Sequence, residues 1–211
     1  MKTDDLIEML SSGADTQPAR DSLAPLWLVA GLLVSAALML ALLGVRANLF
    51  EELMLPAFWS KLVFSLALTA AGWLAVKRLS APGARTTALP FYIGAPVAVA
   101  WLVAAAVLLQ AAPAARADLF WGTTWRYCPL LIALISLPLF AAALRIMRSR
   151  APTRLRSAGA AAGFAAGAAA AAVYCLHCPE LSIVFVGFWY LLGMLIPAAI
   201  GALIGPRVLA W

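Results

Sequence analysis

The sequence predicts an all-α integral membrane protein: a six-transmembrane-helix bundle that follows a short N-terminal helix, with both chain termini cytoplasmic. The composition is the first reason, because 65% of the residues are hydrophobic and only 11% are charged, with a mean hydropathy of +0.97. Soluble domains average about 45–50% apolar and about 25% charged residues. The second reason is a series of six apolar runs, most of them long enough to cross a hydrocarbon layer of about 30 Å.

The chain is expected to divide into a soluble head, residues 1–22, and a membrane domain, residues 23–211. Thr3 can cap a short helix, and Asp4 and Asp5 then lie in its first turn, where acidic side chains complement the helix dipole. A helix of this length is only marginally stable alone in water. We therefore expect the head to become ordered on a partner or on the membrane surface.

Each predicted span is an apolar run between polar, charged or proline-containing links. The first run contains no charged residue, and the second is short unless the Lys61 side chain extends towards the interface. Pro138 is expected to kink the fourth span, and the fifth consists mostly of Ala and Gly. The spans are predicted at about 24–45, 62–76, 91–112, 128–144, 157–176 and 182–204.

Lys and Arg are distributed unevenly between the links. With the N-terminus in the cytoplasm, eleven of the fifteen basic residues lie in cytoplasmic segments, and the four others lie outside. Positive residues favour the cytoplasmic side, so this distribution predicts the orientation and accounts for the net charge of +6 without nucleic acid. The four on the outer side are Arg46, Lys61, Arg116 and Arg126.

This orientation brings all three cysteines, Cys128, Cys175 and Cys178, to the outer face, beside His177, the single histidine. Cys128 and Cys178 each precede a proline, and each is expected to cap a helix that enters the membrane from outside. Unpaired N–H groups and the helix dipole favour the thiolate there, so both should be more reactive than Cys175. Cysteines in membrane helices are commonly inert, but the grouping near one face favours a working thiol site.

Two chemistries fit these residues. One is a reversible disulfide, for which Cys128 and Cys178 are the best pair because both begin helices at similar depth. The other is capture of a soft metal ion such as zinc or cadmium by Cys128, Cys178 and His177, with Cys175 or Glu180 as a fourth ligand. The sequence leaves the choice between them open.

The interiors of the predicted spans contain no acidic or basic residue and no histidine. Transporters, pumps and proton relays usually need such groups at membrane depth, and a membrane enzyme would show a constellation of catalytic groups. We therefore expect a regulator and not an enzyme.

Gly159, Gly163 and Gly167 recur on one face of the fifth span, a stripe that favours close helix packing.

Several segments together resemble a known family. They are Met1-Lys2-Thr3-Asp4-Asp5-Leu6-Ile7, Trp125-Arg126-Tyr127-Cys128-Pro129, His177-Cys178-Pro179-Glu180, Trp189-Tyr190-Leu191-Leu192-Gly193-Met194 and Gly205-Pro206-Arg207. With six spans, this combination is similar to the bacterial membrane-bound anti-sigma factors of the NrsF type, negative regulators of an extracytoplasmic-function (ECF) sigma factor. The resemblance implies a multi-pass protein of the bacterial inner membrane whose head holds the sigma factor inactive.

The resemblance also implies roles for individual residues. Cys128 and Cys178 correspond to the paired sensing cysteines of the family, whereas Cys175 matches no known position. Membrane lipid is the other expected partner, direct binding of nucleic acid is not expected, and no cofactor is expected beyond a transient soft metal ion. The predicted sigma-binding residues are Lys2, Thr3, Asp4, Asp5, Leu6 and Ile7, together with Leu10, whose apolar side chain would join Leu6 and Ile7 in a groove of the sigma factor.

The leading hypothesis is a sensor in which oxidation or metal binding at Cys128 and Cys178 releases the sigma factor. One alternative is a membrane thiol-disulfide oxidoreductase that passes electrons between the Cys-x-x-Cys pair, Cys175 and Cys178, and a quinone. It would need a second cysteine pair, and only one cysteine remains. The other alternative is a soft-metal transport or tolerance protein, which the uncharged spans argue against.

Overall fold

The computed structural model describes residues 3–12, 23–81 and 83–210, and these are helical with irregular links and no strand. The helices are α1 (Thr3–Ser12), α2 (Ala24–Leu42), α3 (Leu49–Glu52), α4 (Pro56–Leu79), α5 (Leu89–Gln110), α6 (Pro113–Trp121), α7 (Cys128–Arg148), α8 (Leu155–Tyr174), α9 (Ile183–Phe185) and α10 (Leu191–Val208), with a π-helix η1 (Val186–Tyr190) between the last two.

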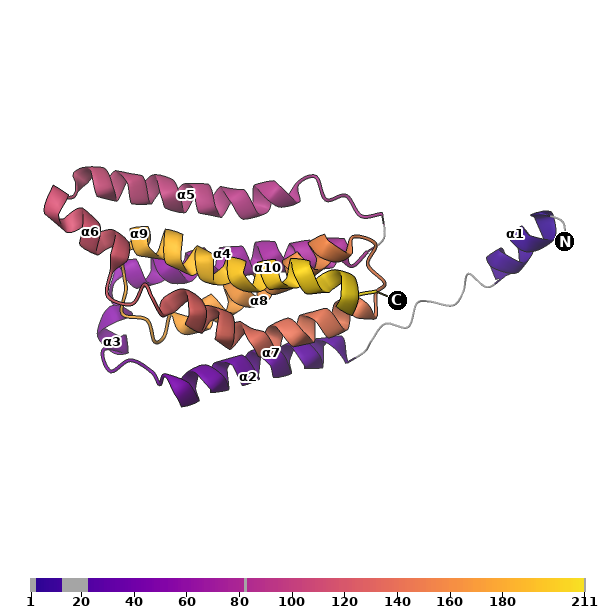
Figure 1. Cartoon of the computed structure of the whole chain (residues 1–211), viewed down its shortest axis with the longest axis horizontal. Helices are drawn as coiled ribbons and strands as arrows, with labels where there is room; N and C mark the ends of the chain where they lie inside the picture. Colours follow the sequence, from indigo (N-terminus) through magenta and orange to yellow (C-terminus); the bar gives the residue numbers. More distant parts are fainter. Residues whose placement is uncertain (1–2, 13–22, 82, 211) are drawn as a thin grey trace.

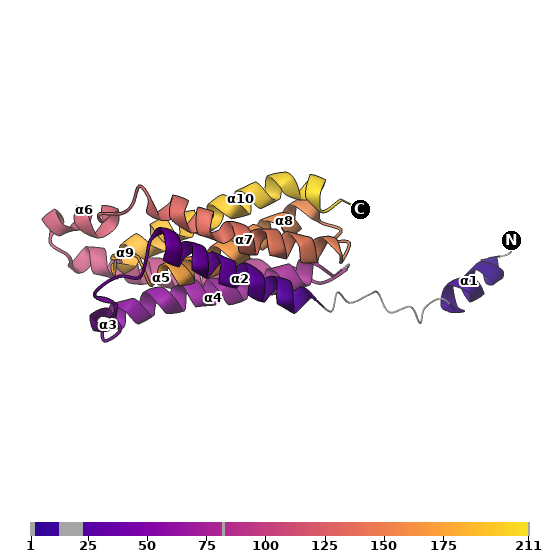
Figure 2. The same ribbon diagram turned by 90° about the horizontal axis from the view of Figure 1, so that it is seen from below.

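Six of the helical segments in the described part are long and apolar enough to cross a membrane. They are α2, α4, α5, α7, α8 and the continuous segment Ile183–Val208, which joins α9, η1 and α10. These segments run side by side along one axis (Figures 1 and 2). The start of α2 and the end of α10 lie at the same end of the bundle, as six crossings require (Figure 1). The predicted all-helical class is confirmed for the described residues, with six helical segments that are long and apolar enough to span a membrane.

The second span differs most from its prediction. Helix α4 begins at Pro56 and not at residue 62. Proline suits a first turn because its missing N–H group would have no helical partner there. Lys61 consequently lies inside the helix with no exposed surface, and its side chain reaches the link between α8 and α9.

Helix α8 is at the centre of the bundle. In the most apolar 18-residue stretch of α8, 72% of the residues are buried, whereas in that of α5 only 11% are buried. The glycines of α8 make contact with α10: a Cβ atom added at Gly159 would collide with the Gly201 carbonyl, and one added at Gly163 with the Pro197 carbonyl. The close packing predicted from the glycine stripe is therefore present.

Helix α5 lies at the edge of the bundle (Figure 1). It packs on α4 and α9, and between it and α4 there is an apolar cavity of about 720 Å³. Trp101 attaches it to the last span by donating an Nε1–H hydrogen bond of 3.0 Å to the Gly187 carbonyl.

Helix α1 has Asp4 and Asp5 in its first turn, as predicted, but Thr3 is its first helical residue and not the residue that caps it. It is described here by itself, because residues 13–22 lie outside the described part of the chain.

Candidate thiol site

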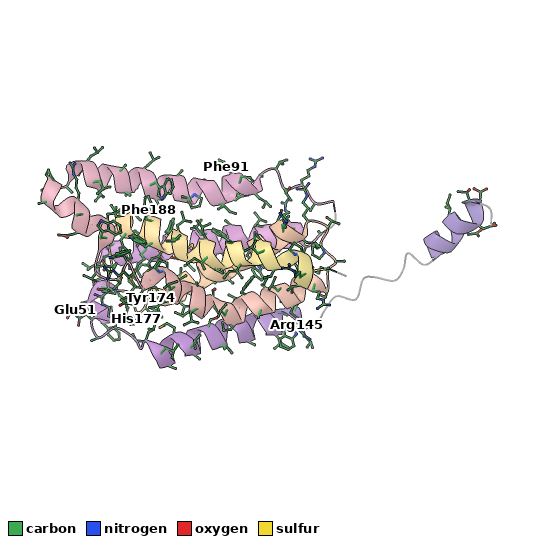
Figure 3. All side chains as sticks on the ribbon, viewed as in Figure 1. Glu51, Phe91, Arg145, Tyr174, His177 and Phe188 are labelled. Atoms are coloured by element: carbon green, nitrogen blue, oxygen red, sulfur yellow. The ribbon has the colours of Figure 1, made fainter. Side chains whose placement is uncertain are left out.

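The three cysteines lie at the end of the bundle opposite the start of α2. Cys128 is the first residue of α7, Cys175 follows the last residue of α8, and Cys178 belongs to the link before α9. Figure 3 shows His177, from the same link, at this end, and Arg145 at the other. All three thiols are buried, with exposed fractions of 0%, 1% and 0%. They share one end, as predicted, but beneath its surface.

The expected helix caps are only partly present. Cys128 does begin α7, with Pro129 in the first turn. Cys178 does not cap the last span, because α9 begins five residues later, at Ile183, and residues 178–182 are not helical. The prediction that a helix dipole activates Cys178 is therefore wrong. The irregular backbone instead leaves the carbonyls of Cys178 and Glu180 available to side chains of other helices.

The thiols of Cys128 and Cys178 are neighbours within hydrogen-bonding reach, and no disulfide joins them. The pKa of the Cys178 thiol is lowered, first by its interaction with the Cys128 thiol, then by the Tyr190 side chain and the Lys61 charge, which together outweigh the opposing effect of burial. The pKa of Cys175 is raised, mainly because the thiol is buried. Cys178 is thus the stronger nucleophile of the two cysteines in the link.

Lys61 contacts the backbone beside this pair, a role that the sequence analysis did not predict. Its Nζ donates hydrogen bonds to the carbonyl oxygens of Cys178, at 2.9 Å, and Glu180, at 3.1 Å. One turn further along α4, the Ser65 hydroxyl lies 3.9 Å from the Cys175 sulfur. The sequence gives one sign of this role: Lys61 is a basic residue directly before an apolar run. The predicted second span, 62–76, begins just after it.

A second basic side chain reaches the same carbonyl from the loop after α2. Arg46 Nη1 lies 3.4 Å from the Cys178 oxygen and also forms an ion pair with the buried Glu52. In the same loop, the Gly44 carbonyl lies 3.1 Å from His177 Nδ1. This loop therefore holds the turn that contains His177 and Cys178.

Glu180 fixes the other end of the link. Its Oε1 accepts hydrogen bonds from the N–H of Thr123 at 2.7 Å, from the Thr123 hydroxyl at 2.8 Å and from the N–H of Thr124 at 3.3 Å. Gly122 has a φ of +54°, and a Cβ atom there would meet the Glu180 carboxylate. The link is thereby attached to the residues just before Cys128.

These contacts bear on the expected metal ligands. His177 Nδ1 faces a backbone carbonyl, and the Glu180 carboxylate is already hydrogen-bonded. Within residues 3–12, 23–81 and 83–210, no group of three His, Cys, Asp or Glu side chains has the geometry to hold a metal ion. Cys128, Cys178 and His177 thus form no ligand set in this arrangement.

The π-helix η1 contributes one residue near the thiols. It contains Tyr190, a fully buried residue whose hydroxyl is near the Cys175 and Cys178 thiols but has no hydrogen-bond partner of good geometry in the described chain. Short π-helical segments are frequent at functional sites. Here the segment turns a polar group towards the sulfurs.

The head residues are described less completely. Thr3, Asp4, Asp5 and Ile7 are exposed, with 59% of Ile7 accessible. Lys2 and the side chains of Leu6 and Leu10 lie outside what the structure describes. The described side chains of α1 thus combine acidic groups with an exposed apolar residue.

The fold and the site define a class: a bundle of six membrane-length helices with an interacting, buried dithiol at one end and a short acidic helix before the first span. The chain belongs to the family described as negative regulator of sigma F (NrsF), whose model matches residues 11–211. It is 54% identical to "Probable anti-sigma-F factor NrsF" of Azospira oryzae and 40% identical to "Anti-sigma-F factor NrsF" of Caulobacter vibrioides, each over the full length of both chains. No solved structure matches the chain.

Proposed function

We propose that this protein is an anti-sigma factor of the bacterial inner membrane that holds an ECF sigma factor through residues 1–22 and releases it when Cys128 and Cys178 form a disulfide. Two full-length relatives bear anti-sigma names. The observation that carries the sensing part is the contact between the Cys128 and Cys178 thiols, which come from different segments of the bundle.

The charge distribution supports an orientation with the head in the cytoplasm. Lys77 and Arg78 end α4, and Arg145 and Arg148 end α7, at the end of the bundle where α2 begins. Basic residues favour the cytoplasmic side of a membrane. The thiols at the opposite end would then lie towards the oxidising outer compartment, where disulfides persist.

The head is suited to a protein partner. Asp4, Asp5 and Glu8 would face basic groups of the sigma factor, and Ile7 would enter an apolar groove with Leu6 and Leu10, in the manner of an amphipathic helix. An acidic helix is repelled by an anionic lipid surface, which favours the protein partner over the membrane.

Release requires that oxidation change the bundle. A disulfide would pull the start of α7 and the α8–α9 link together, and α8 would pass the movement to α10 through their closely packed backbones. The two states of the bundle must differ by a few kcal/mol in their affinity for the sigma factor if the signal is to be effective.

The test uses the full-length protein in detergent micelles with its sigma factor bound. Hydrogen peroxide should release the sigma factor from the wild-type protein and from Cys175→Ser, but not from Cys128→Ser or Cys178→Ser. Asp4→Ala/Asp5→Ala should bind the sigma factor weakly before any oxidation. Retention of the sigma factor by oxidised wild-type protein would exclude the redox mechanism, and unchanged binding by the head variant would exclude the assigned contact.

Zinc and cadmium ions are the second trigger for the same assay, because thiolates bind both. Release by either ion from the reduced protein, with no disulfide formed, would make metal capture the primary event. That outcome would require rearrangement of the link, since His177 faces Gly44 in the present arrangement.

A further inference from the structure

Lys61 is a buried cation whose charge no carboxylate balances within the described part of the chain. Its exposed fraction is 0%, and its Nζ is held by two neutral carbonyl oxygens, those of Cys178 and Glu180. Arg46, the other basic group at this carbonyl, differs because it is paired with Glu52. Burying a charged amine away from water is unfavourable unless a counter-charge is near.

The groups near Lys61 that can become negative include the three cysteine sulfurs. The Lys61 charge is close enough to interact with all three thiols, and it reaches Cys178 through the same carbonyl that it holds. A simple anchoring role would use the two hydrogen bonds alone and would need no charge. An anionic Cys178 sulfur would instead supply a counter-charge to Lys61, which forms no ion pair within the described part of the chain, since Glu52 pairs with Arg46 and the Glu180 carboxylate accepts from Thr123.

We propose that Lys61 is the positioning residue of the thiol pair: its ammonium group holds the Cys178–Glu180 backbone beside Cys128 and stabilises the anionic Cys178 sulfur that attacks the oxidant. This inference rests on the proposed redox function and assigns a residue to it. Lys61 acts through its charge and its two hydrogen bonds.

With a hydroperoxide as the oxidant, the chemistry balances in two steps. The Cys178 thiolate attacks one peroxide oxygen, an S–O bond forms, the O–O bond breaks, and the departing hydroxide takes up a proton to become water. The Cys128 sulfur then attacks the sulfenic sulfur of Cys178, the S–S bond forms, and the S–O bond breaks. The second hydroxide leaves as water with the Cys128 proton. Two thiols thereby lose two electrons to one peroxide.

The charge of Lys61 should affect both the rate and the equilibrium. A cation beside the attacking sulfur raises the thiolate fraction and so speeds the first step. The disulfide is neutral, so its formation removes the anion that balanced the ammonium group. Stabilisation of the reduced form makes a disulfide more oxidising, and Lys61 thus shifts the equilibrium towards the reduced pair.

The experiment follows disulfide formation in reduced, full-length protein in micelles after addition of hydrogen peroxide, by alkylation of the remaining thiols and mass spectrometry. Lys61→Met removes the charge and the hydrogen bonds, Lys61→Gln keeps a neutral donor, and Lys61→Arg keeps the charge. Lys77→Met, an exposed lysine at the far end of the same helix, is the matched control.

We expect the Met and Gln variants to react about tenfold more slowly, the Arg variant to react at close to the wild-type rate, and the control to be unchanged. In glutathione buffers, the Gln variant should hold its disulfide about tenfold more strongly, a potential about 30 mV more negative. An anchoring role alone would slow the Met variant and leave the Gln variant unchanged in rate and potential.

Wild-type rates in Lys61→Gln would overturn the proposal while leaving the redox function in place. Failure of the wild-type protein to form the Cys128–Cys178 disulfide at all would overturn both. The melting temperature shows whether Lys61→Met folds. If it does not, the rates of Lys61→Gln and Lys61→Arg are compared, and a slower Gln variant supports the role of the charge.

Discussion

At the scale of single residues, the setting of Cys178 illustrates how the pKa of a thiol can be lowered without a helix terminus. Its carbonyl is held by Lys61 and Arg46, its thiol lies beside that of Cys128, and Glu180 fixes the backbone that follows. Each of these groups comes from a different part of the chain. The nucleophile is therefore defined by tertiary contacts.

The pH dependence of oxidation follows from the lowered pKa of Cys178. The thiolate is the reacting form, so a lowered pKa keeps it populated at pH values where an ordinary thiol, with a pKa of about 8.5, is protonated. We expect the rate with hydrogen peroxide to stay nearly constant from about pH 9 to about pH 7 and to fall only below the Cys178 pKa. The protein unfolded in denaturant is the control, and a folded profile that declines in parallel with it would contradict the assignment.

Sequence reasoning could find the cysteine pair but not its surroundings. Cys128 and Cys178 were found because each precedes a proline near one predicted face. His177 and Glu180 were assigned to a metal by residue type alone, whereas their polar atoms contact Gly44 and Thr123. Contacts between loops so far apart in the chain leave no local pattern in it.

At the scale of elements, the boundary of α4 decides where the thiol site is. A charged residue normally marks the edge of an apolar span, so the predicted second span begins just after Lys61. The helix instead begins at Pro56, and Lys61 is buried against the link between α8 and α9. The other spans were predictable because their apolar runs are uninterrupted, and the central place of α8 follows from its small residues.

The contact between α8 and α10 gives a prediction about stability. In Gly163→Ala, the new methyl group would overlap the Pro197 backbone, which cannot yield as a flexible side chain can. We expect a loss of about 1–3 kcal/mol in the free energy of unfolding, measured by thermal or denaturant unfolding in micelles. The matched control is Gly94→Ala in α5, where the added atom meets open space. Equal stability of the two variants would argue against close backbone contact.

At the scale of the whole molecule, the basic last turns of α4 and α7 lie at the end of the bundle opposite the thiols, a helix length away (Figure 1). A signal at the thiols must therefore travel along the helices to reach the end where α2 begins. The orientation of the molecule in the membrane decides which compartment each end faces.

A labelling experiment tests this orientation without relying on the buried native thiols. In a chain with all three cysteines replaced by serine, Glu51→Cys introduces an exposed thiol in α3, at the end that contains His177 (Figure 3), and Arg150→Cys introduces one after α7. We expect a membrane-impermeant maleimide to label the first variant in intact spheroplasts and the second only after lysis. The reverse pattern would invert the proposed topology.

The burial of the three sulfurs has a kinetic consequence. A pair with no exposed surface admits peroxide or other small uncharged molecules more readily than folded reductases or glutathione. Reduction must then wait for a transient opening of the link that Glu180 and Lys61 hold closed. The oxidised protein would therefore persist after the oxidant has been removed, and its lifetime would be set by how often that link opens.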